Sequence, residues 1–345
     1  MPKSSQRQPN ANQDKRERTV TPANATASEA RVLPEYAPVP KSSLGPALND
    51  QGYYVGRVEK NLYWITDGVY QSAFLTTTDG VVLLDAPPTI GGNIQRAVDE
   101  TAAANGVSNK VTHLVYSHHH ADHIGASSLF KKSVVRIAHD ETKRLLKRDN
   151  DTARPVPDET FEDSRMLNIG GSRIELAWRG ANHSPDNIYI HLPDHDTLMF
   201  IDIILPGWAP FETFNLNEDV PGSIKAPEIA LSYQWKHFIG GHLGRLGTRE
   251  DVTVYQRYVT DIVDSITSVM SSNTIDPTPY FQKYGNNMWA AYKGLLDEIT
   301  DAAAAPVIEK YTGVLAAADV STRSTTFWIM ESLRLDLGLG SQVHP

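Results

Sequence analysis

The sequence predicts an α/β fold, in which two mixed β-sheets pack face to face with helices outside, followed by a helical extension. Strand-like and helix-like segments alternate between Gly52 and His242, an order that suits such layers. Polar residues also follow several apolar runs directly, and strand ends are where α/β proteins usually place their chemistry. Beyond Gly244 the pattern becomes helical.

Three parts follow from composition. Residues 1–45 are rich in Pro, Ser, Ala and Asn with few aromatics, which predicts a flexible N-terminal arm. Residues 46–247 carry the alternating pattern and form the predicted main domain. Residues 248–345 form the C-terminal helical extension packed on it. With 345 residues, of which 40% are hydrophobic, the chain can fill a sizeable core.

The main domain begins with strands. The stretch Gly52–Asp85 is rich in Val, Tyr, Trp and Thr, and Asp67-Gly68 and Asp79-Gly80 interrupt it as hairpin-turn signals. Residues Ile90–Asn105 then predict an amphipathic helix that stops at Gly106. Its apolar side would consist of Ile94, Ala97, Val98 and Ala102.

Helices dominate the extension. Thr248–Asp251 resembles a capping box, and a long helix is expected to follow to about Ser272. Tyr280–Ala318 reads as mostly helical with an interruption at Pro306. The apolar spacing within Ser321–Leu337 predicts a further helix. These helices could cap a site or mediate dimerisation.

Residues 118–123 hold four histidines and an aspartate, directly after the apolar run Val111–Tyr116. Alternate residues of an extended chain share a face, so His118 and His120 can point to one ion while Asp122 and His123 face a neighbouring one. Histidine is the commonest metal ligand, and aspartate adds a hard oxygen. A solvated polar loop would leave Asp122 and His123 unexplained. The cluster therefore predicts a metal site.

More ligands must come from downstream, because each ion needs at least three protein groups besides a water. His183, Asp202 and His242 each follow an apolar, strand-like run. Any one of them is ambiguous, since an Asp after a strand is often a turn residue or helix cap. Their order after the first cluster makes the joint case strong.

With Asp85 closing Gly80–Leu84 ahead of these motifs, the chain resembles the metallo-β-lactamase-fold hydrolase superfamily over about residues 60–245. The resemblance implies an αββα sandwich and two divalent metal ions, Zn²⁺ first, with Mn²⁺ or Fe²⁺ as alternatives. It further implies that His118, His120 and His183 hold one ion, that Asp122, His123 and His242 hold the other, and that Asp202 bridges both. Asp85 would orient a histidine by accepting its free ring N–H.

The residue at the bridging position indicates which branch of the superfamily the chain resembles. The chain has no cysteine, so it cannot resemble antibiotic-degrading members that use a Cys at the fourth motif. Asp202 there is similar to glyoxalase II, lactonases, and phosphodiester and phosphotriester hydrolases. No motif for glutathione binding is recognisable, so glyoxalase II itself is not favoured.

The resemblance implies a dinuclear hydrolase, in which a bridging hydroxide attacks an ester, lactone or related acyl bond. Asp122 would be both ligand and acceptor of the hydroxide proton. Phosphotriester or β-lactam hydrolysis on the same site is an alternative. A mononuclear-iron oxidoreductase similar to persulfide dioxygenase and a non-catalytic binding member are less favoured, because neither explains a complete set of ligands.

The substrate is expected to be small and fairly apolar. An apolar, aromatic loop follows Asp202, and the predicted substrate contacts are Trp64, Leu205, Trp208 and Phe211. Ordinary loop packing is the alternative interpretation of these side chains.

Composition also bounds partners and location. A net charge of −9 argues against nucleic acid, and no apolar run reaches membrane-spanning length. The N-terminus lacks the apolar core of a secretory signal, so a cytoplasmic location is expected. A small-molecule substrate is the expected partner, and a homodimer is one option. The remaining motif-adjacent histidines are not expected to bind metal: His113, His119, His139, His191, His195 and His237.

Overall fold

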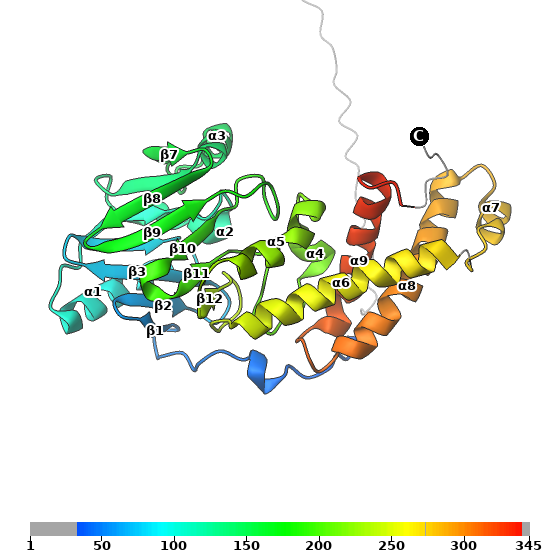
Figure 1. Cartoon of the computed structure of the whole chain (residues 1–345), viewed down its shortest axis with the longest axis horizontal. Helices are drawn as coiled ribbons and strands as arrows, with labels where there is room; N and C mark the ends of the chain where they lie inside the picture. Colours follow the sequence, from blue (N-terminus) through cyan, green and yellow to red (C-terminus); the bar gives the residue numbers. More distant parts are fainter. Residues whose placement is uncertain (1–32, 273, 340–345) are drawn as a thin grey trace, which may run out of the picture. The chain divides into compact units, whose positions relative to one another are not determined.

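The computed structural model describes residues 33–272 and 274–339 and contains two mixed β-sheets (Figure 1). In the first sheet the strands lie in the order β1 to β7, antiparallel from β1 to β4 and parallel from β4 to β7. In the second the order is β12-β11-β10-β9-β8, and only the β11–β12 pair is parallel among these neighbours.

The first sheet contains β1 (Tyr54–Glu59), β2 (Leu62–Thr66), β3 (Gln71–Thr77), β4 (Gly80–Leu84), β5 (Val111–Val115), β6 (Val135–His139) and β7 (Glu159–Phe161). The second contains β8 (Ser164–Ile169), β9 (Ser172–Ala177), β10 (Tyr189–Leu192), β11 (Thr197–Met199) and β12 (His237–Ile239). The helices described are α1 (Asn93–Asn105), α2 (Ala121–Ile124), α3 (Asp140–Asp149), α4 (Glu212–Leu216), α5 (Val220–Ser232), α6 (Arg249–Ser272), α7 (Thr278–Tyr284), α8 (Met288–Tyr311) and α9 (Ala318–Leu335).

Alternation along the strands builds the layers. In β4, Val81 and Leu83 pack in the cluster that includes α1, whereas Val82 and Leu84 pack between the two sheets. In the second sheet, Leu198 of β11 faces the helices on the outer side. Successive strand side chains point to opposite faces, so each sheet has two apolar faces to cover. The result is the predicted αββα sandwich with a C-terminal helical extension.

The helix α1 follows the sequence expectation closely. Its buried residues are Ile94, Ala97, Val98 and Ala102. Gly106 ends it with φ 68°, and its N–H bonds to the carbonyls of Ala102 and Ala103. Glycine adopts this left-handed conformation without the Cβ clash that other residues meet.

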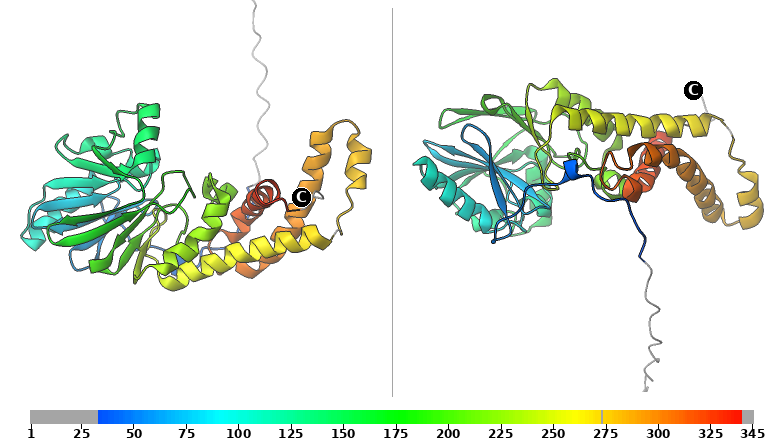
Figure 2. Two further views of the ribbon diagram at one scale, coloured as in Figure 1. Left: turned by 45° about the horizontal axis from the view of Figure 1, so that its top comes forward. Right: turned by 90° about the horizontal axis from the view of Figure 1, so that it is seen from below.

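The extension departs from expectation at Pro306, which lies inside α8 and does not interrupt it. A proline removes one helical hydrogen bond and crowds the preceding turn. The buried neighbours Ala303 and Val307 pack in a core shared with α6 and α9, and tertiary packing of this kind outweighs local propensity. Figure 2 shows α8 beside both helices. None of the described helices combines the length and apolarity that crossing a bilayer requires.

Part of the predicted N-terminal arm is packed. Residues 1–32 lie outside the described residues. The Ser43 hydroxyl donates to the Gly207 carbonyl at 2.7 Å, and the Trp208 indole N–H donates to the Ser43 carbonyl at 3.1 Å. This stretch therefore lies against the loop that follows Asp202.

Candidate metal centre

The histidine motif begins where β5 ends and runs into the short helix α2. At the strand end, the Asp85 carboxylate accepts the Ser117 backbone N–H at 2.7 Å. His120 keeps an extended backbone, φ −64° and ψ 141°, and the helix starts at the next residue. This change from extended to helical backbone turns alternate residues of the motif toward two neighbouring positions.

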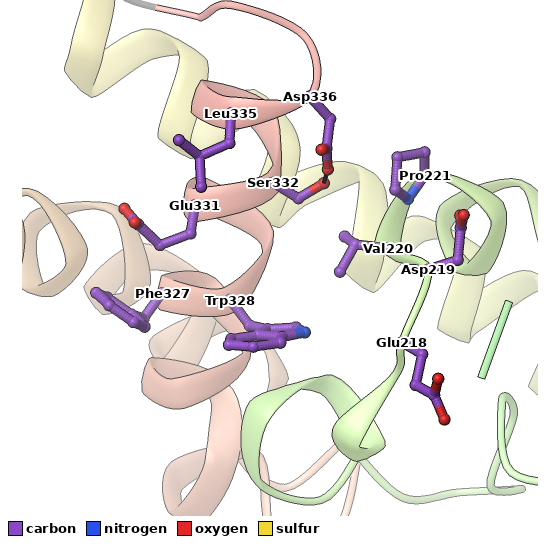
Figure 3. Close-up of a pocket in the computed structure, with 10 residues that line it drawn as sticks. All are labelled: Glu218, Asp219, Val220, Pro221, Phe327, Trp328, Glu331, Ser332, Leu335 and Asp336. Carbon is purple, nitrogen blue, oxygen red and sulfur yellow. Dashed lines mark hydrogen bonds between the residues drawn. The ribbon is translucent and has the colours of Figure 1, made fainter. Parts of the chain in front are cut away.

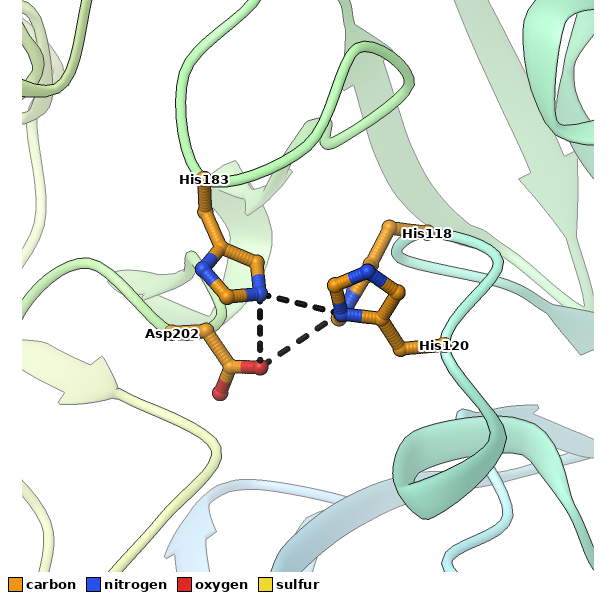
Figure 4. Close-up of side chains that lie close together, drawn as sticks. All are labelled: His118, His120, His183 and Asp202. Carbon is orange, nitrogen blue, oxygen red and sulfur yellow. Dashed lines mark hydrogen bonds and ion pairs between the residues drawn. The ribbon is translucent and has the colours of Figure 1, made fainter. Parts of the chain in front are cut away.

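The first group of ligands comprises His118, His120, His183 and Asp202, whose donor atoms all lie within 4.8 Å of one another. His120 Nδ1 lies 3.0 Å from His183 Nε2, which lies 3.3 Å from Asp202 Oδ2. His118 Nε2 lies 3.6 Å from the same oxygen. Figure 4 shows these side chains pointing toward one another, with His118 and His120 on one loop and His183 and Asp202 on two others.

The second group comprises Asp122, His123, Asp202 and His242. His123 Nε2 lies 2.8 Å from Asp202 Oδ2, and His242 Nε2 lies 3.1 Å from Asp202 Oδ1. Asp122 Oδ2 lies 3.5 Å from His123 Nε2. Asp202 thus belongs to both groups, and the structure brings together all seven residues that the sequence nominated.

The donor set fits a divalent cation. Burial and the neighbouring imidazoles hold the pKa of His118 well below its usual value, and burial chiefly lowers that of His120 to about 4. Both rings are then neutral, as metal ligands must be. His118 Nε2 is buried and has no hydrogen-bond partner among the described residues. A cation between the groups would satisfy this nitrogen.

In the second group the neighbouring carboxylates favour a protonated histidine, in contrast to the neutral rings of the first group. Burial alone would lower the pKa of His123, yet the Asp202 carboxylate, with Asp122 and Asp85, raises it to about 9. Burial likewise opposes ionisation of Asp202, but His123 and His242 hold its pKa well below the usual range. The carboxylates therefore attract positive charge to this position.

Backbone contacts fix the bridging aspartate. Asp202 has φ 65°, and its N–H donates to the Gly240 carbonyl at 3.1 Å. The Asn215 side chain donates to the Asp202 carbonyl at 3.0 Å. A Cβ on Gly240 would lie 2.3 Å from the Ile204 carbonyl oxygen, so the close approach requires glycine. The loops carrying Asp202 and His242 are thereby locked together.

His183 is held from the side away from the centre. Its Nδ1 lies 3.0 Å from Asn217 Oδ1, and its backbone N–H donates to Asn182 Oδ1 at 2.7 Å. Glu218 Oε1 lies 4.0 Å from His120 Nε2. Asn215 and Asn217 were not predicted from the sequence, because single asparagines in a loop form no recognisable motif.

Asp85 lies beside the ligands but contacts them differently from expectation. Its Oδ1 accepts the Ser117 N–H, while Oδ2 is buried without a hydrogen-bond partner among the described residues. Burial raises the pKa of Asp85 to about 6. No hydrogen bond joins it to a histidine ring within the described part of the chain, so its visible role is to hold the loop before His118.

The histidines set aside in the sequence lie outside both ligand groups. His119 Nδ1 lies 2.9 Å from Asp186 Oδ1, which also accepts the Ser184 hydroxyl, while Asp186 Oδ2 accepts the Thr142 hydroxyl. The others contact Thr112 (His113), Glu162 (His139), Gln234 (His191), Asn61 (His195) and Glu59 (His237). Each of these rings thus has a structural partner for at least one of its nitrogens.

A cavity of about 520 Å³ opens onto the centre. Its lining is Val69, Tyr70, His120, Asp122, His183, Asp202, Leu205, Phe211, Asn215, Leu216, His242 and Leu243. Leu205 and Phe211 thus lie where the sequence placed substrate contacts. Trp64 and Trp208 do not: Trp64 packs between the sheets, and the Trp208 indole N–H bonds to Ser43. The direction of the side chain in β2 turns the Trp64 ring away from the cavity. A bend in the loop that follows Asp202 does the same for the Trp208 ring.

Tyr70 lines the cavity but was not among the substrate contacts predicted from the sequence. Its ring centroid lies 4.6 Å from that of His242, and an isolated bridge pairs the two backbones. It follows Asp67-Gly68, the turn between β2 and β3, so the hairpin tip carries it to the cavity. The turn signal was visible in the sequence, but its approach to His242 was not.

The cavity is bordered by an unusual turn. Thr213, Phe214, Asn215 and Leu216 in α4 all have positive φ, between 50° and 58°. Left-handed backbone costs roughly 1–2 kcal/mol for each residue other than glycine. The turn buries Phe214 and leaves Leu216 64% exposed at the cavity. Strain of this kind persists where surrounding contacts hold it, often at functional sites.

A second cavity of about 620 Å³ lies between Glu218–Pro221 and α9 (Figure 3). It contains neither ligand group, so the chemistry belongs to the first cavity. Glu218 borders it, and the same residue's Oε1 lies 4.0 Å from His120 Nε2.

The chain is similar to known proteins over the same region. The model of the metallo-β-lactamase superfamily matches residues 65–236. A metallo-β-lactamase type 2 from Bacteroides fragilis is 33% identical over 90 residues, 26% of this chain and 35% of that protein. One from Bacillus cereus is 24% identical over 152 residues, 42% and 57% of the two chains. The chain thus spans 35% and 57% of these relatives' lengths.

A solved structure shows the same fold. The metallo-β-lactamase from Pontibacter korlensis superposes with a TM-score of 0.51 at 18% identity. The match covers 60% of this chain and 99% of that one, so this chain contains a substantial part that the shared fold does not include.

Proposed function

Since the chain belongs to the metallo-β-lactamase superfamily, we propose that it is a dinuclear metal-dependent hydrolase of small, fairly apolar esters, lactones or related acyl compounds. The observation that carries the proposal is the sharing of Asp202 by two complete ligand groups. Each group supplies more than the three protein ligands that a catalytic site needs.

The two ions, with Zn²⁺ the first expectation, would supply a water nucleophile near neutral pH and polarise the scissile carbonyl. The protein groups then handle the proton. The Asp122 side chain is 42% exposed and lines the cavity. In the proposed mechanism its carboxylate accepts the proton of the attacking water and returns it to the leaving group.

The cavity lining supports an uncharged substrate. Val69, Leu205, Phe211, Leu216 and Leu243 provide apolar surface. None of the described lining residues is Lys or Arg, so an anionic group would find no cationic side chain to pair with there. An ester or lactone needs only this apolar rim and the polarised carbonyl.

β-Lactam hydrolysis is the second candidate, because the relatives are named metallo-β-lactamases. The lack of a cationic lining residue weighs against substrates bearing a carboxylate. A neutral phosphotriester would also fit the apolar rim, and it stays a variant of the proposal. A homodimer through the C-terminal helices remains a prediction.

The test is a hydrolysis panel on metal-quantified protein, with lactones, aryl esters, thioesters, β-lactams and phosphotriesters as substrates. Asp202→Ala should lose most bound metal and all metal-dependent turnover, because both groups lose a ligand. His237→Ala is the matched control, since this histidine lies in neither group. Wild-type protein that binds about two ions per chain yet turns over none of the panel would contradict the proposed reaction.

A further inference from the structure

We propose that helix α9, outside the region matched by the family model, positions a metal ligand: Trp328 holds Asn217, and Asn217 orients the imidazole of His183. The inference rests on the metal centre of the proposed function. It adds that the C-terminal extension sets metal affinity without lining the cavity.

The first step is the contact between Asn217 and His183. His183 Nε2 faces the centre, 3.3 Å from Asp202 Oδ2, while Nδ1 lies 3.0 Å from Asn217 Oδ1. An amide oxygen only accepts, so Nδ1 carries the hydrogen and Nε2 keeps its lone pair toward the metal. His183 is 5% exposed and Asn217 1%, so water does not compete. Such partners fix ring orientation and tautomer.

The second step is what holds Asn217. It directly follows the left-handed residues 213–216, a conformation that the chain alone disfavours. The Trp328 indole N–H donates to the Asn217 carbonyl at 3.1 Å, and in Figure 3 this nitrogen points toward the loop that carries Glu218. Ser324 Oγ also accepts the Thr213 N–H at 3.1 Å. Hydrogen bonds from α9 therefore secure the turn.

The same turn also contacts Asp202, the aspartate shared by both ligand groups. The Asn215 side chain donates to the Asp202 carbonyl at 3.0 Å, two residues before Asn217. The Ser321 hydroxyl of α9 donates to the Pro210 carbonyl at 2.6 Å, at the start of this segment. A shift of the segment would move His183 and Asp202 together, so α9 acts on both.

The experiment measures Zn²⁺ affinity by competition with a chromogenic chelator, without any substrate. Asn217→Leu removes the acceptor and should weaken binding roughly 10- to 100-fold. Asn217→Asp should restore affinity to within about threefold of wild type, because a carboxylate oxygen accepts the same N–H. Asn217 Nδ2 has no partner among the described residues, so this exchange breaks no bond seen there.

The helix itself is tested by Trp328→Phe, which keeps the ring and removes the N–H. Its Zn²⁺ affinity should fall at least threefold, a loss of about 0.7 kcal/mol that matches one hydrogen bond. Trp289→Phe is the matched control, because Trp289 on α8 is 86% exposed. The absorption spectrum of the Co²⁺ form should change in Asn217→Leu and return in Asn217→Asp.

The outcomes separate this inference from the proposed function. Wild-type protein without Zn²⁺ affinity would refute the metal centre itself. Tight wild-type binding that Asn217→Leu leaves unchanged would overturn the role of Asn217. Unchanged affinity in Trp328→Phe would overturn the role of α9.

Discussion

His123 Nε2 lies 2.8 Å from Asp202 Oδ2, so the two side chains form a buried ion pair at the candidate centre. The Asp202 carboxylate and its acidic neighbours outweigh burial and raise the pKa of His123 to about 9. In the metal-free protein a proton thus occupies the place where the second ligand group would hold a cation. Metal ions bind only the neutral imidazole, and so the proton and the ion compete.

Metal binding should therefore release a proton. At pH 8, below the His123 pKa of about 9, binding of the second ion should release about one proton per chain, and less as pH rises above that pKa. Titration calorimetry in two buffers with different ionisation enthalpies measures the number. His123→Gln should lower this number by about one proton, the one that His123 carries. A heat of binding that does not depend on the buffer would contradict the protonated state of His123.

Gly240→Ala should destabilise the protein and its metal centre together. The added Cβ would meet the Ile204 carbonyl oxygen at 2.3 Å, a backbone atom that cannot swing away. Overpacking of this kind costs roughly 1–3 kcal/mol, and the loops of Asp202 and His242 would separate. Chemical denaturation and metal content measure the two effects. Gly92→Ala is the control, because a Cβ there meets nothing within 4 Å, and equal stability of the two variants would contradict the clash.

Phe211→Ala should change substrate binding and leave metal content unchanged. Phe211 is 63% exposed at the mouth of the cavity, so its ring is free to cover an apolar substrate. Loss of that contact should raise KM roughly tenfold, with kcat less affected. Trp208→Phe serves as the control, since its indole contacts Ser43 outside the cavity. A KM effect confined to Trp208→Phe would support the sequence-based prediction for Trp208 and contradict the role of Phe211.

Local chemistry explains why much of the site was predictable. The ligands from His118 to His123 are adjacent in sequence, and His183, Asp202 and His242 follow strand-like runs that converge at one edge. The left-handed turn at residues 213–216 left no such trace, since none of its residues is glycine. Tertiary contacts with α9 select its conformation, and Trp328 is far away in sequence. The prediction for Trp64 was wrong for a simpler reason. A shift of one residue along a strand places a side chain on the opposite face of the sheet.

Asp251 should make stability depend on acid pH. Burial opposes its ionisation, yet hydrogen bonds from Arg245 and Thr248 hold its pKa below the usual value. A carboxylate with a depressed pKa stabilises the fold above the unfolded pKa of about 3.9, and this contribution is lost as pH falls through the lower folded value. Asp251→Asn should therefore cost roughly 1–3 kcal/mol at pH 7, and the difference from wild type should shrink below about pH 4. Urea unfolding at several pH values measures this difference in stability.

The control is Glu250→Gln. The Glu250 side chain is 71% exposed, so this exchange should change stability by less than about 0.5 kcal/mol. If the stability deficit of Asp251→Asn stays constant down to about pH 3, the effect comes from packing. The deficit would then persist at a pH where the Asp251 carboxylate of the unfolded wild-type chain is already largely protonated.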